Sequence, residues 1–323
     1  MHPREGLVLH TVGYEDGGTT RPILYRAALS EMVVPYGDPD TNWRWRAAFD
    51  VGEYTVGKLA SPLEPNLDAP ENAQLIDATF ADDNGKPYVL EKAVGIYERD
   101  SGILWKHYDS VAGKNETRRA RELVIFFVAT IGNYDYAVNY VFKQDGSLEV
   151  DLALSGIMLA KGVKEKRADE NHNAHGATAS AHAGHLVAEN IVAPHHQHFF
   201  SFRLDFDVDG TNNSVTEMNT SAIPAGAANN EYLNGFVMRE TMFKKESEAQ
   251  RQMDMQAARV WSVMNPAAKN SLGHNTSFIL VPGANSLPYI APDAMVRKRA
   301  GFINHHLWAT KYNALELMSG HIC

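Results

Sequence analysis

Residues 123–142 read LVIFFVATIGNYDYAVNYVF, two strongly apolar runs separated by a short stretch that contains polar residues. Both runs are rich in β-branched and aromatic residues, which favour strands. The sequence therefore predicts a mainly antiparallel β protein. Similar runs, bounded by Gly, Pro, Asn or Asp, recur at residues 7–12, 23–34, 74–80, 88–97, 148–159, 199–208 and 278–281.

Hairpin turns are predicted between several of these runs, because Gly, Asn and Asp tolerate positive φ. Two stretches depart from the strand pattern. Residues 246–261 fit either a surface helix or a long irregular crossing, and residues 161–189, rich in Ala, Gly and His, are expected to form a surface loop. The predicted turns are Asp16-Gly17-Gly18, Asp83-Asn84-Gly85, Gln144-Asp145-Gly146 and Asp209-Gly210.

Composition narrows the classes of function. The 323 residues include 39 acidic and 30 basic side chains, a net charge of −9, which argues against a nucleic-acid partner because such proteins need a basic face. Cys323 is the only cysteine, so an internal disulfide and a multi-cysteine zinc site are excluded. No run has the roughly 20 apolar residues of a membrane-spanning helix, and the first residues lack a signal-peptide pattern. We therefore expect no membrane partner and an intracellular location, cytoplasmic or peroxisomal.

A histidine cluster at residues 195–198 (HHQH) precedes the apolar run at 199–204. On a strand, side chains two residues apart share a face, so His196 and His198 can approach one ion together. Two imidazoles would form half of a copper or zinc site. A polar strand end explains the same residues without a metal.

Two further positions could carry chemistry. Thr130 to Tyr136 places Asn, Tyr and Asp inside an apolar segment, which is costly unless these side chains have partners. Asp50 lies among Ala47, Ala48, Phe49 and Val51, and an apolar setting raises a carboxyl pKa toward the range of a general base. A buried tyrosine with a satisfied hydroxyl and an ordinary turn aspartate are the alternatives.

Four ordered stretches carry a resemblance to a known family: residues 31–39 (EMVVPYGDP), residues 49–57 (FDVGEYTVG), Thr130-x-x-Asn133-Tyr134-Asp135, and His196-Gln197-His198. In this order they resemble the catalytic domain of the copper-containing, quinone-dependent amine oxidases. The resemblance extends over essentially the whole chain. It implies one large antiparallel β-sandwich domain over residues 1–323.

The resemblance also implies roles for individual residues. Tyr134 would be the precursor of topaquinone, and Asp50 the base that removes the α-proton of the substrate. Tyr36 would hydrogen-bond a cofactor oxygen, Asn133 would restrain the ring, and His196 and His198 would bind copper. Asp205, Phe206 and Asp207 match a second, calcium-type site, although an alternating polar edge strand explains the same residues without a metal.

The implied reaction converts a small primary amine, water and dioxygen into an aldehyde, ammonia and hydrogen peroxide, in a homodimer. The chain departs from the family at both ends, since the preceding small α/β domains and the C-terminal strands with a third copper histidine have no counterpart here. We therefore expect residues 1–323 to be an inactive fragment that binds copper poorly. The alternatives are a non-catalytic fragment or degenerate homologue that acts only through protein partners, and a simple two-histidine metal-binding module.

Overall fold

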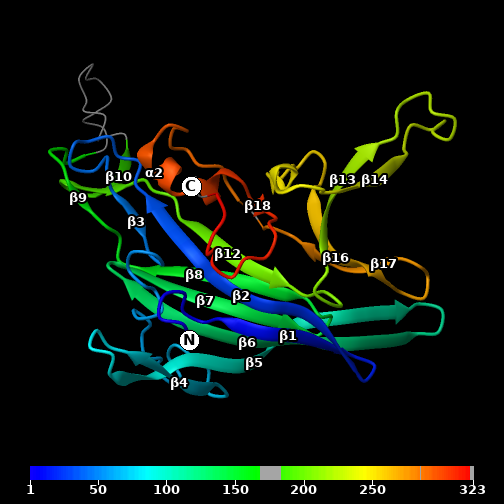
Figure 1. The fold of residues 1–323 in the computed structure, drawn as a ribbon, viewed down its shortest axis with the longest axis horizontal. Helices are drawn as coiled ribbons and strands as arrows, with labels where there is room; N and C mark the ends of the chain where they lie inside the picture. The colour runs from blue at the N-terminus through cyan, green and yellow to red at the C-terminus, as the bar shows by residue number, and fades with distance from the viewer. Residues whose placement is uncertain (168–182, 284, 321–323) are drawn as a thin grey trace. The chain divides into compact units, whose positions relative to one another are not determined.

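The computed structural model describes residues 1–167, 183–283 and 285–320, which form antiparallel strands with almost no helix (Figure 1). The predicted fold class is confirmed. The chain divides into two compact units: residues 1–8 with 31–198, and residues 9–30 with 199–323. The single domain over residues 1–323 stays a prediction. No helix in the described ranges is long and apolar enough to cross a membrane.

The first unit is built on a five-stranded antiparallel sheet in which each strand pairs with the next along the chain. One apolar cluster on this sheet comprises Val124, Phe126 and Val141, packed against Leu63 and Ala69 from the segment that precedes the sheet. The apolar runs of residues 123–142 therefore form two adjacent inner strands of the sheet, and the strands predicted there are confirmed. The strands are β4 (Gln74–Ala81), β5 (Pro87–Asp109), β6 (Lys114–Ile131), β7 (Tyr134–Lys143) and β8 (Leu148–Gly156).

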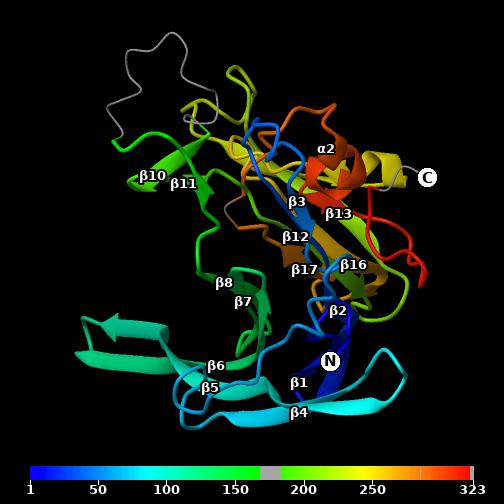
Figure 2. The same cartoon turned by 90° about the vertical axis from the view of Figure 1, so that its left-hand side faces the viewer.

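β5 and β6 are much longer than the apolar runs that predicted them, and their far ends run on past the neighbouring strands as a two-stranded hairpin (Figure 2). Cross-strand ion pairs join the polar half of this hairpin. Arg99 Nε lies 2.8 Å from Glu122 Oε2, and Arg121 Nε lies 2.7 Å from Glu98 Oε1. Opposite charges on the two strands therefore stabilise the pairing of β5 with β6 beyond the apolar part of the sheet.

The expectation of a surface loop at residues 161–189 is partly wrong. Its two ends form β9 (Lys161–Gly162) and β10 (Gly184–Ala188), which both pair with β11 (Ile191–Pro194). β11 contains Val192, which is 3% exposed. The two ends of the expected loop therefore form a small sheet that includes a buried apolar residue. Residues 168–182 lie outside the described residues. A short strand, β3 (Ala47–Phe49), pairs with the end of β2 (Thr19–Pro35).

Among the residues that the structure describes, three further antiparallel sheets belong to the second unit or extend into it, and the smallest pairs residues 250–251 with residues 307–308. β1 (Leu9–Asp16) pairs with β2, which also neighbours β12 (Phe199–Phe206), and a four-stranded sheet has the order β14-β13-β16-β17. Residues 246–261 form an irregular crossing, so the surface-helix alternative is wrong. The other elements are β13 (Ser214–Ala222), β14 (Phe236–Met242), η2 (Glu246–Glu248), β15 (Gln250–Arg251), β16 (Val260–Lys269), β17 (Asn275–Leu280), α2 (Met295–Arg299), η3 (Gly301–Asn304) and β18 (Leu307–Trp308).

All four predicted turns contain positive-φ residues. Gly17 and Gly18 join β1 to β2, Gly85 lies between β4 and β5, and Gly146 lies between β7 and β8. Asp209, with φ of 51°, and Gly210 follow β12. The turn chemistry read from the sequence is therefore confirmed at each joint.

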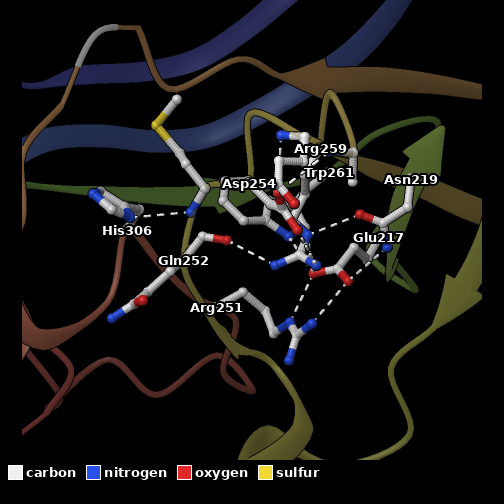
Figure 3. A network of polar contacts seen from close by, with 11 residues as sticks. Glu217, Asn219, Arg251, Gln252, Asp254, Arg259, Trp261 and His306 are labelled. Atoms are coloured by element: carbon white, nitrogen blue, oxygen red, sulfur yellow. Dashed lines mark hydrogen bonds and ion pairs between the residues drawn. The ribbon is translucent and has the colours of Figure 1, made fainter. Parts of the chain in front are cut away.

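A buried carboxylate ties the irregular crossing to the four-stranded sheet (Figure 3). Glu217 on β13 is 4% exposed and accepts hydrogen bonds from Arg251 (2.7 and 2.9 Å) and from Trp261 Nε1 (3.2 Å). Burial by itself raises the pKa of Glu217, but these donors outweigh it and hold the pKa at about 2. The network therefore fixes a segment that has almost no regular structure of its own.

We expect Glu217→Ala to destabilise the protein by about 1–3 kcal/mol, because it removes the buried carboxylate that accepts hydrogen bonds from Arg251 and Trp261. Glu240, exposed on the neighbouring strand β14, provides the matched control, and Glu240→Ala should change stability by less than about 0.5 kcal/mol. Urea unfolding of both variants measures the difference. Equal stabilities would contradict the role given to Glu217.

Candidate active site

Tyr134 is placed by a tight hairpin turn between β6 and β7. Ile131 pairs with Tyr134, and only Gly132 and Asn133 lie between them. Gly132 has φ of +60° while Asn133 has no positive φ, which is the pattern of a two-residue turn that needs Gly at its first central position. The turn explains Gly132 and Asn133, whereas Tyr134 and Asp135 lie on β7, and the sequence pattern did not predict this turn.

The hydroxyl of Tyr134 meets three other groups. Tyr36 Oη donates to it at 3.2 Å, and the backbone N–H of Leu159 donates at 3.4 Å. His196 Nε2 lies 3.3 Å away. The Tyr36 ring also stacks on the His196 ring with centroids 4.8 Å apart, so the side chains on either side of the Tyr134 oxygen support each other.

The histidines lie between β11 and β12, whereas the sequence pattern placed them on a strand. A bridge between Tyr36 and His196, together with the hydrogen bond from Gly37 N to His195 O (2.8 Å), holds this segment extended. Alternation still applies in an extended segment, and the rings of His196 and His198 lie 5.0 Å apart between centroids. The structure therefore brings the two imidazoles together.

The proton on His196 can be assigned from its partner. Its Nδ1 lies 2.9 Å from the carbonyl oxygen of Pro194, which only accepts hydrogen bonds, so Nδ1 carries the hydrogen. Nε2 then has a lone pair directed at the Tyr134 hydroxyl, which donates to it. Burial, with a smaller contribution from His196, lowers the pKa of His198 to about 4, so that ring is neutral at pH 7.

Imidazole nitrogens are donors that suit copper, so the pair of histidines fits half of a copper site. No group of three or more His, Cys, Asp or Glu side chains able to hold a metal occurs among the residues that the structure describes. The copper assignment of His196 and His198 stays a prediction.

Asp50 follows β3 and is 2% exposed. Its Oδ2 accepts a hydrogen bond from Tyr136 Oη at 3.2 Å, while its Oδ1 is buried with no hydrogen-bond partner among the described residues. Burial raises the pKa of Asp50 to about 6, repulsion by Glu31 and Glu53 adds to the rise, and the Tyr136 hydrogen bond opposes it. A carboxylate with one unused oxygen and a pKa near neutrality is suited to proton abstraction.

Glu31 supports the turn that carries Asp50. Its Oε1 accepts hydrogen bonds from the backbone N–H groups of Val51 (3.2 Å) and Gly52 (2.9 Å), and Arg4 Nη2 approaches Oε2 at 3.4 Å. A Cβ on Gly52 would lie 2.4 Å from Glu31 Oε2. The close approach explains why the turn after Asp50 contains glycine.

We expect Gly52→Ala to destabilise the protein by about 1–3 kcal/mol, because the added methyl group displaces the Glu31 carboxylate. Gly162 provides the control, since a Cβ there meets no atom within 4 Å and its φ is not positive. Thermal unfolding of the two alanine variants tests this, and a Gly52→Ala variant as stable as Gly162→Ala would contradict it.

A cavity of about 240 Å³ adjoins the site and offers room for a small molecule beside Tyr134. Its wall includes Tyr136 and His198 as well as Tyr134, with the rest supplied by β8 and the residues that follow it. Leu154 is 50% exposed and Met158 is 51% exposed, so part of this wall is open to solvent. The cavity is lined by Tyr134, Tyr136, Leu154, Ser155, Gly156, Met158 and His198.

Two features predicted from the sequence remain, the role of Asn133 and the calcium site at residues 205–207. Asn133 is exposed, and its backbone carbonyl accepts a hydrogen bond from Ile157 N at 2.6 Å. Asp205 pairs with Arg203 (3.0 Å) and retains a buried Oδ2 without a partner within the described ranges. Asp207 donates its backbone N–H to Ile23 O at 2.8 Å, and Phe206 ends β12. The role of Asn133 and the calcium site of Asp205, Phe206 and Asp207 stay predictions.

Tyr136 and Glu31 are the two residues whose roles sequence reasoning missed. Tyr136 had a detectable signal, because it lies two residues after Tyr134 on a strand and so shares its face. Glu31 was part of a recognised stretch, but nothing in the sequence pattern connects it to the turn 20 residues later. Only the folded chain brings them together.

The chain is similar to known amine oxidases along nearly its whole length. The family described as "Copper amine oxidase, enzyme domain" matches residues 1–323. The histamine oxidase of Arthrobacter globiformis is 40% identical over 314 residues, covering 97% of this chain and 44% of that protein. The peroxisomal diamine oxidase 1 of Nicotiana tabacum is 38% identical over 323 residues, covering 98% of this chain and 39% of that protein.

A solved structure resembles the whole chain as well. The copper-containing benzylamine oxidase of Hansenula polymorpha superposes with a TM-score of 0.88 at 27% identity, covering 98% of this chain and 47% of that one. The chain thus spans less than half the length of these relatives. Because the family matches every residue and relatives share up to 40% identity, the chain belongs to the copper amine oxidase family.

Proposed function

We propose that the protein containing residues 1–323 oxidises small primary amines with dioxygen, using copper and a quinone formed from Tyr134. The reaction takes one amine, one dioxygen and one water to one aldehyde, one ammonia and one hydrogen peroxide. The amine carbon loses two electrons and dioxygen gains them. The observation that carries the proposal is the meeting of Tyr36 Oη and His196 Nε2 at the Tyr134 hydroxyl, at 3.2 and 3.3 Å.

His196 and His198 would hold the metal through ring nitrogens. When bound, copper and dioxygen would supply the oxidation of the Tyr134 ring to a quinone, which gives the site its two-electron acceptor. Tyr36 keeps a hydroxyl directed at the Tyr134 oxygen and so restrains the ring. Of these side chains, Tyr134 and His198 also line the cavity, where an amine could reach them.

Asp50 would remove the α-proton of the bound amine. Its Oδ2 is occupied by Tyr136, and its Oδ1 has no other partner in the part of the chain that the structure describes. With a pKa raised to about 6, the carboxylate is largely ionised at pH 7 yet more basic than an ordinary aspartate. This combination supports its role as the general base.

We also propose a homodimer, with the β5–β6 hairpin as the contact. Large apolar side chains near its tip are exposed, with Val111 at 97%, Tyr108 at 59% and Ile103 at 58%. Such side chains on a projecting hairpin favour burial against another chain. Sedimentation velocity tests the proposed homodimer, and a monomer at micromolar concentration would contradict it.

An intracellular, cytoplasmic or peroxisomal location also stays a prediction.

Amine turnover by the full-length protein tests the proposed function. After treatment with Cu²⁺ in air, we expect amine-dependent oxygen uptake with equal amounts of hydrogen peroxide and aldehyde. The panel should include methylamine, benzylamine, histamine and a diamine, because the relatives named above differ in the amines that their names give. No turnover with any member, in protein that has bound copper, would contradict the proposal and favour a non-catalytic homologue.

A further inference from the structure

The hydroxyl of Tyr136 lies between the candidate base and a candidate metal ligand. Tyr136 is on β7 and is 1% exposed. Its Oη lies 3.2 Å from Asp50 Oδ2 and 3.3 Å from His198 Nδ1. These two residues are 148 positions apart in the sequence, and one oxygen atom contacts both.

The donors and acceptors of these three groups favour one arrangement when Asp50 is ionised. A tyrosine hydroxyl has a single proton, and an ionised carboxylate can only accept. The Tyr136 proton therefore goes to Asp50 Oδ2, as charge-assisted hydrogen bonds are the stronger kind. The Tyr136 oxygen can then only accept from His198, which requires the hydrogen of that imidazole to be on Nδ1.

We propose that Tyr136 is a positioning residue that bridges Asp50 and His198 and fixes His198 in the tautomer with hydrogen on Nδ1. The proposal rests on the proposed function for the identity of the metal, but not for the hydrogen bonds themselves. It assigns Tyr136 a role in preparing the metal ligand and in holding one oxygen of the base, leaving Oδ1 for the substrate.

The neighbouring histidine supports this reading independently. The Pro194 carbonyl fixes His196 with hydrogen on Nδ1, and Tyr136 does the same for His198 with a side chain. Both rings then keep a lone pair on Nε2. A metal-binding histidine commonly donates its other N–H to an oxygen acceptor, which sets the tautomer before the metal arrives.

Nitrogen-15 NMR of histidine-labelled protein tests the bridge without metal or amine. At pH 8, where Asp50 is ionised and histidine side chains are ordinarily neutral, we expect His198 to carry its hydrogen on Nδ1. In Tyr136→Phe we expect the population to shift toward the Nε2–H form, which free histidine prefers. His196 should be unchanged in both proteins, because its Nδ1 partner is a backbone carbonyl.

Tyr140→Phe is the matched control. Tyr140 is fully buried on the same strand, four residues from Tyr136, and its removal should leave the His198 tautomer as in the wild type. A wild-type His198 with hydrogen on Nε2 would overturn the proposal, and so would an unchanged tautomer in a folded Tyr136→Phe protein. The wild-type spectrum alone therefore keeps the proposal falsifiable if the variant does not fold.

Copper affinity provides a second readout. Loss of a hydrogen-bond partner behind a metal ligand typically weakens metal binding about 10- to 100-fold. We expect a Cu²⁺ competition titration to show a loss of this size for Tyr136→Phe and none for Tyr140→Phe, and equal affinities would overturn the link to the metal. A protein that shows the Nδ1–H form of His198 but no amine turnover would contradict the proposed function while leaving the bridge supported.

Discussion

Tyr134→Phe is expected to reduce amine-dependent peroxide production by the full-length, copper-treated protein to background. Phenylalanine keeps the ring but lacks the oxygen that Tyr36, Leu159 and His196 contact in the folded chain. Without that oxygen, the ring cannot be oxidised as a phenol to a quinone. The measurement is peroxide release with the best amine of the panel.

The control for Tyr134→Phe is Tyr140→Phe, which removes a buried hydroxyl from the same strand outside the site. We expect this control to keep its activity and to unfold at nearly the same denaturant concentration as Tyr134→Phe. Turnover that persists in Tyr134→Phe would show that another group accepts the electrons.

Asp50→Asn is expected to lower kcat/KM for amine oxidation by about 100- to 10,000-fold, the usual contribution of a general base. The amide is nearly the same size as the carboxylate and can still accept a hydrogen bond from Tyr136, so the fold should be preserved. Binding of the amine should change much less than the chemical step. Steady-state kinetics with matched substrate concentrations separates the two effects.

The pH dependence gives Asp50 a signature of its own. Since the base acts in its ionised form and its pKa is raised to about 6, kcat/KM should fall tenfold per pH unit below about pH 6. Glu53→Gln removes a nearby negative charge that raises the pKa of Asp50, so this acid limb should move to lower pH. An acid limb that does not respond to Glu53→Gln would count against Asp50 as its source.

Several residues that the sequence singled out lie close together in the folded chain. Three of these residues, Tyr134, Tyr36 and Asp50, lie in stretches that resemble the family. In the folded chain Tyr36 is hydrogen-bonded to Tyr134, and Asp50 is hydrogen-bonded to Tyr136, whose ring lies next to that of Tyr134. The i, i+2 spacing of His196 and His198 also predicted their proximity, although the element was wrong. Local alternation holds in any extended segment, so the prediction did not depend on a regular strand.

Other features could not be predicted because they depend on contacts between distant segments. Glu31 reaches the turn after Asp50 only when β2 and that turn are packed together. The polar half of the β5–β6 hairpin lacks apolar alternation and is paired through opposite charges instead. The crossing at 246–261 has a composition that suits a helix. In the folded chain, however, Arg251 and Trp261 both donate hydrogen bonds to the Glu217 carboxylate, and a continuous helix would hold these two residues too far apart for that.

The most direct test of the account is the chemical state of Tyr134 itself. Full-length protein should be exposed to Cu²⁺ and air, treated with a hydrazine reagent that captures quinones, and digested for peptide mass analysis. We predict a coloured adduct on the peptide that carries Tyr134, absent when copper is withheld and absent in Tyr134→Phe. An unmodified Tyr134 peptide from protein that has bound copper would contradict the central claim.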